Sequence, residues 1–151
     1  MKQITKKDLI FVGIQAILLL IYFIPINPIV FHLNYFLRIA NLSISIIGLI
    51  IILFAFLQLN KNLTPFPTPI ESGTLIQAGL YKYIRHPIYT GIIIFSVFFG
   101  IFNESIWNIF IGFALFILFY FKSKYEESLL KKQYKDYDNY TKKTGRFFPF
   151  I

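Results

Sequence analysis

Four long apolar segments dominate the pattern of hydrophobic and polar positions along the chain. They are residues 9–26, 39–59, 87–102 and 105–121, and none of them contains Asp, Glu, Lys or Arg. As a helix, the first segment would extend about 27 Å, close to the roughly 30 Å hydrocarbon core of a bilayer. The last two segments are shorter, and only Asn103 and Glu104 separate them. The pattern therefore predicts four transmembrane helices, the last two joined as a tight helical hairpin.

Two stretches outside these segments have a character of their own. Between the second and third segments, residues 60–86 contain three closely spaced prolines at positions 65, 67 and 69, which exclude a regular helix there and predict an ordered interfacial loop. After residue 121, Leu130, Tyr134, Tyr137 and Thr141 recur at helical spacing among charged residues. We expect an amphipathic cytoplasmic helix over residues 122–144. The predicted fold is all-α, a single polytopic membrane domain over residues 1–151.

The composition supports a membrane protein and excludes several classes of site. The chain is 56% apolar and only 15% charged, whereas soluble domains are nearer a quarter charged. Cysteine is absent, which excludes disulfides, thiolate nucleophiles and cysteine-based metal sites, and no other metal site is predicted. The net charge of +8 sits outside the apolar segments. That distribution fits contact with anionic lipid headgroups and argues against a nucleic-acid partner.

Basic residues also predict the orientation in the membrane. With the N-terminus inside, every one of the 15 Lys and Arg residues except Arg38 falls on the cytoplasmic side. The positive-inside rule therefore places both termini in the cytoplasm. The oligomeric state has no signature in the sequence.

The stretch from Tyr81 to Gly91, "YKYIRHPIYTG", places a cationic and aromatic run directly before the third apolar segment. Proline is favoured in the first turn of a helix, so Pro87 is expected to begin the helix and His86 to cap it. Free amides, the helix dipole and Arg85 would suit an anionic group there, and the neighbouring tyrosine rings would suit adenine or a cation. Alternatively, Arg85 and the tyrosines only anchor the helix at the interface.

Two adjacent acidic residues, Glu126 and Glu127, lie in the lysine-rich margin just after the fourth segment. A carboxylate there could bind an amino group, a sulfonium or ribose hydroxyls. The alternative is a helical pairing one turn along, such as Glu127 with Lys131.

Taken together, these motifs resemble those of the isoprenylcysteine carboxyl methyltransferase and phospholipid methyltransferase group of integral membrane enzymes. The typical pattern is G-x-Y-x-x-x-R-H-P-x-Y-x-G before one span, then E-E-x-x-L after the next, a Tyr-containing helix and an R-F-x-P ending. It is met by the following residues: Gly79, Tyr81, Arg85, His86, Pro87, Tyr89, Gly91, Glu126, Glu127, Leu130, Tyr137, Arg146, Phe147 and Pro149. The resemblance covers residues 60–151, while the first two segments match only in being apolar.

The resemblance implies methyl transfer from S-adenosylmethionine to a lipid-like amphipathic acceptor, a carboxylate or an amine, drawn from the bilayer. It also implies that the donor is held by the interfacial loop, the start of the third helix and the C-terminal helix. The implied cofactor contacts are Thr74, Leu75, Ile76, Tyr81, His86, Pro87, Ile88, Tyr89 and Glu126.

The resemblance further implies a substrate contact at Lys122, where carboxyl methyltransferases usually have Arg four residues before the first Glu of the pair. Lys keeps the charge but loses the bidentate fork that suits a carboxylate. Arg85 is predicted as a second substrate contact. No catalytic base is assigned, because a carboxylate acceptor is already ionised at neutral pH.

Two other functions remain open at this point. Sterol and steroid reductases of the same fold group bind NADPH and typically read H-P-N-Y, whereas Ile88 stands at the asparagine position here. A small four-helix membrane protein without enzymatic activity would also carry interfacial Arg and Tyr residues, but it would not require the spacing of the acidic pair and the R-F-x-P ending.

Overall fold

The structure is a computed structural model that describes residues 4–26, 29 and 31–149. The predicted domain, residues 1–151, therefore includes short stretches that lie outside the described residues. The elements are, in chain order, α1 Lys6–Tyr22, α2 Tyr35–Leu59, η1 Asn60–Asn62, η2 Gly79–Lys82, α3 Pro87–Phe102, α4 Ile106–Gln133 and α5 Tyr137–Thr141. The described residues contain no β-strand, apart from one isolated parallel bridge between Ile84 and Gly145, so the prediction of an all-α fold is confirmed.

Local capping decides where the long helices begin. Thr5 and Asp8 form a capping box, so α1 starts before its apolar stretch, at Lys6. Asn34 caps α2 and Ser105 caps α4 through their side-chain oxygens. Pro87 begins α3, as the sequence predicts.

The C-terminal part differs from the prediction. α4 continues without a break to Gln133, so the fourth apolar segment and the first part of the predicted helix 122–144 form one helix. The rest of that predicted helix is interrupted at Tyr134, whose backbone is extended, and resumes only as the short helix α5. A change from apolar to polar side chains alters what a helix packs against, but it does not interrupt the backbone hydrogen bonds.

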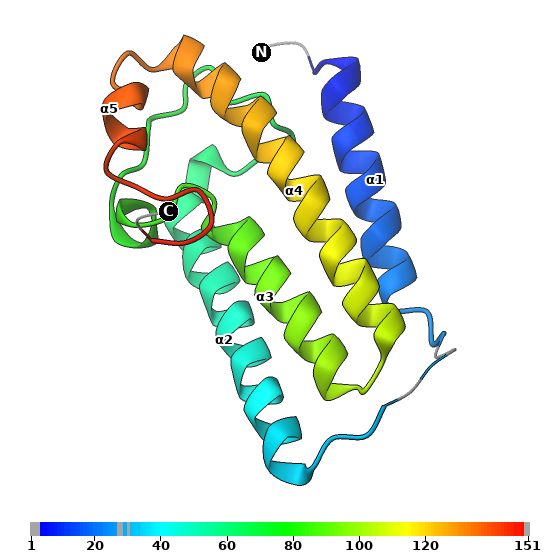
Figure 1. Ribbon diagram of the computed structural model, residues 1–151. Helices are drawn as coiled ribbons and strands as arrows, with labels where there is room; N and C mark the ends of the chain where they lie inside the picture. The colour runs from blue at the N-terminus through cyan, green and yellow to red at the C-terminus, as the bar shows by residue number, and fades with distance from the viewer. Residues whose placement is uncertain (1–3, 27–28, 30, 150–151) are drawn as a thin grey trace.

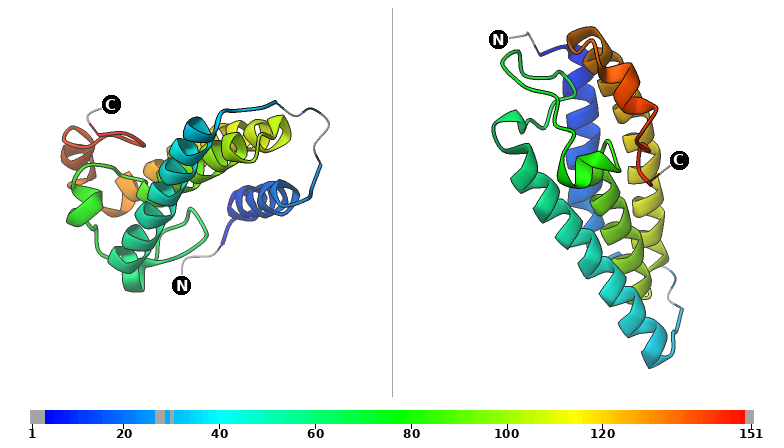
Figure 2. Two further views of the ribbon diagram at one scale, coloured as in Figure 1. Left: turned by 90° about the horizontal axis from the view of Figure 1, so that it is seen from below. Right: turned by 90° about the vertical axis from the view of Figure 1, so that its left-hand side faces the viewer.

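The helices pack in the order α1, α4, α3, α2 (Figures 1 and 2). At the α2–α3 contact, a Cβ on Gly48 would lie 2.8 Å from the carbonyl oxygen of Gly91, so the two backbones touch. α1 packs on α4 and stands apart from α2 when the molecule is viewed along its long axis (Figure 2). α1 is thus attached to the bundle through α4.

Two helices, α2 and α4, are long and apolar enough to cross a membrane, and α3 is apolar but shorter. Large apolar side chains are exposed along the outer faces of the bundle, including Leu20, Phe36 and Phe110. The loop 60–86, α5 and the beginning of α1 gather at one end, whereas the end of α1, the start of α2 and the α3–α4 turn lie at the other (Figure 1). The polar clusters from the sequence thus share one end of the bundle.

Candidate active site at the polar end of the bundle

The centre of the polar end is the buried carboxylate of Glu127. It accepts hydrogen bonds from Arg85 Nε at 2.9 Å and His86 Nε2 at 3.2 Å. Arg146 donates two more, from Nε at 3.1 Å and from Nη2 at 2.7 Å. Lys131, which one helical turn would bring to Glu127, instead pairs with Asp138 at 2.8 Å. Glu127 therefore joins α4 to the start of α3 and to the C-terminal segment.

The C-terminal segment lies beside the residues that precede α3. Arg85 N donates to Gly145 O at 2.9 Å, His86 N donates to Arg146 O at 3.1 Å, and Gly145 N donates to Tyr83 O at 3.1 Å. The Arg85 guanidinium also donates to the carbonyl oxygens of Thr141 and Thr144. These bonds hold His86 and Arg85 in fixed positions at the mouth of the bundle.

A stack of aromatic rings connects His86 to the second acidic residue, Glu126. The Tyr89 ring lies parallel to His86 at 5.3 Å and to Phe119 at 4.6 Å between ring centroids. The Tyr89 hydroxyl donates to Glu126 Oε2 at 2.8 Å. Within the described part of the chain that is the only hydrogen bond to Glu126, whereas Glu127 is fully occupied. Glu126 is thus the carboxylate left with an oxygen for a ligand.

The loop over the polar end is held at several points along its length. Asn62 pairs with the backbone of Thr74, accepting from Thr74 N at 3.2 Å and donating to Thr74 O at 2.9 Å. Asp8 of α1 accepts from Thr68 N at 3.1 Å and Thr68 Oγ1 at 2.7 Å. Gln133 of α4 donates to Ile70 O at 2.8 Å. These bonds fix the loop as a roof over the polar end, called the roof loop.

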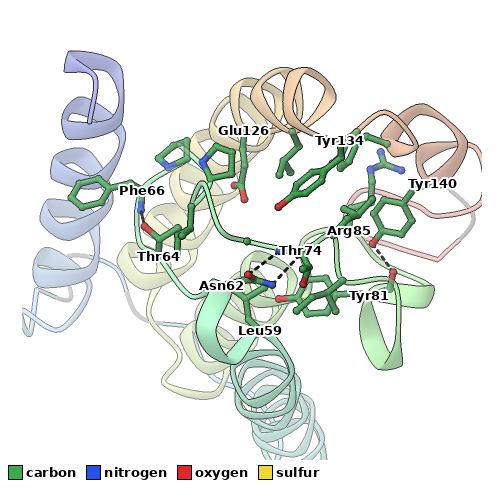
Figure 3. A pocket seen from close by; sticks show the side chains of 18 residues that line it. Leu59, Asn62, Thr64, Phe66, Thr74, Tyr81, Arg85, Glu126, Tyr134 and Tyr140 are labelled. Atoms are coloured by element: carbon green, nitrogen blue, oxygen red, sulfur yellow. Dashed lines mark hydrogen bonds between the residues drawn. The ribbon is translucent and has the colours of Figure 1, made fainter. Parts of the chain in front are cut away.

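Two cavities adjoin under this roof. The first, called the loop cavity, is about 660 Å³ including its open mouth, and it lies between the roof and α4 (Figure 3). The second, called the helix cavity, is about 840 Å³ on the same measure, and it extends down between α1, α2, α3 and α4. Both cavities are lined by Tyr81, Arg85 and Glu126. The wall between them is therefore built from the clusters around residues 85 and 126.

The loop cavity combines aromatic rings with one carboxylate. Tyr81, Tyr134, Tyr137 and Tyr140 line it, and Glu126 points into it from α4 (Figure 3). Burial raises the pKa of Tyr81 and of Tyr137 well above the ordinary value, and the charge of Glu126 or Glu127 raises it further. Burial also raises the pKa of Tyr140 to about 12. These phenols stay neutral at physiological pH, so Glu126 supplies the negative charge of the loop cavity.

The sequence-predicted site residues divide between the two cavities. Thr74, Leu75 and Ile76 line the loop cavity, and Tyr81 and Glu126 line both. His86, Ile88, Tyr89 and Lys122 line only the helix cavity. Arg85 borders both, but its Nε and Nη1 groups are engaged by protein oxygens. Pro87 is buried and begins α3, and in the described structure it borders neither cavity.

Several residues that line or support the site were not predicted from the sequence as site residues. Tyr134 was expected only on one face of a helix, and Tyr137 only there and in the family pattern, without a contact to a ligand; both line the loop cavity, together with Tyr140. Asn62 and Asp8 fix the roof loop, but the sequence pattern does not distinguish them from other polar residues. Gln15 of α1 lines the helix cavity, and its position as the one amide within the segment 9–26 was a signal that could have been followed. The described residues contain no cluster of His, Asp and Glu that could hold a metal ion.

Fold and site together define an all-helical protein with apolar outer faces and a paired cavity at its polar end. The chain belongs to the phospholipid methyltransferase family, whose pattern it matches over residues 36–137. Its fold is similar to that of a eukaryotic intramembrane Ras methyltransferase, the isoprenylcysteine carboxyl methyltransferase, with a TM-score of 0.71 at 24% sequence identity. That similarity covers 78% of this chain and 44% of the other, so this chain spans less than half of that enzyme's length. Comparison with curated protein sequences gives no significant match.

Proposed function

We propose that the protein transfers a methyl group from S-adenosylmethionine to a lipid-like acceptor at the cytoplasmic surface of a membrane. In this proposal all four long helices span the bilayer, and both termini lie in the cytoplasm. The observation that carries it is the pair of adjoining cavities with a shared wall of Tyr81, Arg85 and Glu126. A methyl donor and its acceptor need separate sites that meet at one point, and this arrangement supplies them.

The loop cavity fits the donor. Tyrosine faces bind an adenine ring and a sulfonium, and the free oxygen of Glu126 suits the amino group or the ribose hydroxyls. Thr74, Leu75 and Ile76 contribute the wall that the roof loop forms. When bound, S-adenosylmethionine supplies a methyl group on a cationic sulfur that leaves as a neutral thioether.

The helix cavity fits the acceptor. It opens from the polar end into the apolar interior between α2 and α3, where Phe56, Ile88 and Ile92 line it. A lipid tail would lie among these side chains, with its head near Lys122 and Glu126. Residues of both α1 and α2 line this cavity, so such a tail would enter it from the bilayer between these two helices.

The chain's own contribution to the reaction is alignment and exclusion of water. The acceptor's lone pair must approach the methyl carbon in line with the bond to sulfur, and holding two reactants in that geometry is itself a large rate effect. The stack of His86, Tyr89 and Phe119 makes the wall at the meeting point rigid. A carboxylate acceptor needs no base, whereas an amine would lose a proton to solvent or to Glu126.

Calorimetry on the purified protein tests the proposal against its alternatives. We expect micromolar binding of S-adenosylmethionine and no binding of NADPH. Binding of NADPH alone would favour a reductase, and binding of neither would favour a non-enzymatic membrane protein. Incubation of membranes that contain the protein with radiolabelled methyl donor, followed by mass spectrometry of the labelled lipids, would then identify the acceptor.

A further inference from the structure

Two helices hold the roof loop over one short stretch, from Pro65 to Thr68, through side chains of opposite charge. Asp8 of α1 accepts from Thr68 N at 3.1 Å and from Thr68 Oγ1 at 2.7 Å. Lys122 of α4 donates from Nζ to Pro65 O at 3.0 Å. Pro65 lines the helix cavity and Pro67 lines the loop cavity. The stretch that these two side chains hold therefore borders both cavities.

The ammonium of Lys122 has partners on several sides. Besides Pro65 O, it donates to Gln15 Oε1 at 2.6 Å, and it lies 5.3 Å from the centre of the Tyr89 ring. An ammonium has three N–H groups, so two oxygens and one aromatic face meet its full capacity. Lys122 borders the helix cavity, but only 1% of its surface is exposed. In the described structure, protein groups therefore occupy this ammonium.

Two nearby carboxylates compensate the charge of Lys122. Glu126 and Asp8 both attract the ammonium electrostatically, although Glu126 is bonded to Tyr89 and Asp8 to Thr68. A buried charge is costly unless opposite charges and hydrogen bonds compensate it. Lys122 has both kinds of compensation, so its charge needs no ligand.

A lysine suits this set of partners better than the arginine of the carboxyl methyltransferases would. The N–H groups of an ammonium point in three directions, whereas a planar guanidinium forms two parallel bonds to one carboxylate. The partners of Lys122 come from three parts of the chain, since Gln15 belongs to α1, Pro65 to the roof loop and Tyr89 to α3. The contacts of Lys122 are thus those of a side chain that joins three elements.

We propose that Lys122 is a positioning residue, which fixes the roof loop over the loop cavity through Pro65 O and does not bind the acceptor head. This role takes the place of the substrate contact that the resemblance implies at this position. Its effect on the methyl donor rests on the proposed function, because the loop cavity is the proposed donor site. Its effect on the roof loop does not depend on that function.

Lys122→Met tests the proposal in the purified full-length protein, because it removes the ammonium and keeps a long side chain. Amide hydrogen exchange at residues 64–70 should become about fivefold faster or more, while exchange in α3 is unchanged. By calorimetry, affinity for S-adenosylmethionine should fall about threefold or more, in line with a lost hydrogen bond. The unfolding temperature should stay close to that of the wild type, because removal of a costly buried charge offsets the lost hydrogen bonds. A residue needed only for folding would lower the unfolding temperature instead.

Two further variants separate this role from the alternatives. Lys124→Met makes the same change at an exposed position of α4, and it should leave both roof exchange and donor affinity unchanged. Lys122→Arg keeps the charge and supplies the residue that suits a carboxylate contact. Its planar fork should not reach all three partners, so roof exchange should rise as in Lys122→Met. Lys122→Arg also gives a result if the methionine variant fails to fold.

Roof exchange at the wild-type rate in either variant of Lys122 would overturn the inference. Calorimetry of the wild-type protein with S-adenosylmethionine separates the two levels of proposal. If the donor does not bind, the proposed function fails, and the exchange measurement still decides the role of Lys122. If the donor binds but roof exchange is unchanged in the variants, only the positioning role fails.

Discussion

Arg146 meets Glu127 through two parallel hydrogen bonds, Nε to Oε1 at 3.1 Å and Nη2 to Oε2 at 2.7 Å. The contact joins Glu127 on α4 to Arg146, which follows α5. Hydrogen bonding to Glu127 also raises the pKa of Arg146 above its already high ordinary value. The two adjacent glutamates therefore have separate roles, Glu127 in structure and Glu126 in binding, which the first two predictions test.

Glu127→Gln should destabilise the protein severely. Arg85 and Arg146 would each lose the charge that compensates them, and His86 would lose a charged acceptor. Breaking a buried ion pair from one side typically costs about 3–5 kcal/mol. We expect a large drop in the unfolding temperature of the detergent-solubilised protein. A variant that unfolds at the wild-type temperature would show that the Glu127 centre is not what holds the three segments together.

Glu126→Gln should leave the unfolding temperature near that of the wild type, because Tyr89 can still donate to the amide oxygen. It removes the negative charge of the loop cavity, so affinity for S-adenosylmethionine should fall about tenfold or more, in line with the cost of losing a charged hydrogen bond. Calorimetry measures the loss, with the exposed Lys124→Gln as the matched charge control. Wild-type affinity in Glu126→Gln would remove this residue from the donor site.

The sequence predicts structural features that depend on neighbouring residues better than contacts between residues that are far apart in the chain. Pro87 begins α3 as expected, because the rule for proline in the first helical turn is local. The motifs around residues 85 and 126 were expected to lie close together, and the structure brings them into contact. The fourth apolar segment was expected to end near residue 121, but hydropathy marks where lipid contact ends and not where the helix does.

Long-range partners were beyond what the sequence pattern could give. Glu127 has Lys131 one turn away as a local partner, and nothing in the spacing reveals that Arg146 and Arg85 outcompete it. Gln15 is likewise a single amide whose meaning depends on Lys122, more than a hundred positions later. Division of the site into two cavities follows from how the roof loop lies over the helices, which composition and periodicity do not encode.

Gly91→Ala should weaken the contact between α2 and α3. A Cβ at Gly91 would lie 2.6 Å from the carbonyl oxygen of Gly48, a backbone atom that cannot move aside without shifting the helix. We expect a loss of about 1–3 kcal/mol, as for other overpacked interiors, seen as a lower unfolding temperature. Gly13→Ala is the matched control, since a Cβ there meets nothing within 4 Å, and it should be neutral or slightly stabilising through helix propensity.

Asp8→Asn should loosen the roof of the loop cavity. Asp8 holds Thr68 through two hydrogen bonds, and the neutral amide keeps only one acceptor oxygen for them. Amide hydrogen exchange should become faster across residues 63–78 while exchange in α3 is unchanged, and affinity for the methyl donor should fall moderately. Thr68→Val, which removes the hydroxyl donor and keeps the backbone N–H of residue 68, should have a smaller effect in the same direction. Unaltered exchange in both variants would mean that the roof is held elsewhere.

Tyr140→Phe should change how stability depends on alkaline pH. Burial raises the pKa of Tyr140 from 10.0 to about 12, so the unfolded chain loses this proton at lower pH than the folded protein does. The resulting stability is complete below pH 10.0 and is lost as pH rises toward about 12. Removing the phenol should therefore flatten the fall in unfolding temperature over that interval, with the exposed Tyr83→Phe as control. Parallel curves for wild type and Tyr140→Phe would contradict the assignment.

The pairing of residues 83–86 with 145–146 has a consequence for biosynthesis. The ribosome makes all the long helices before it makes Gly145 and Arg146. The bundle can therefore insert before Arg146 pairs with Glu127 and before the backbone hydrogen bonds of residues 145–146 form. Until residues 145–146 are made, only Arg85 and His86 of these three residues can donate to Glu127. Maturation of the site is thus a late event, and shortening the chain before residue 146 should yield a protein that reaches the membrane but never becomes competent there.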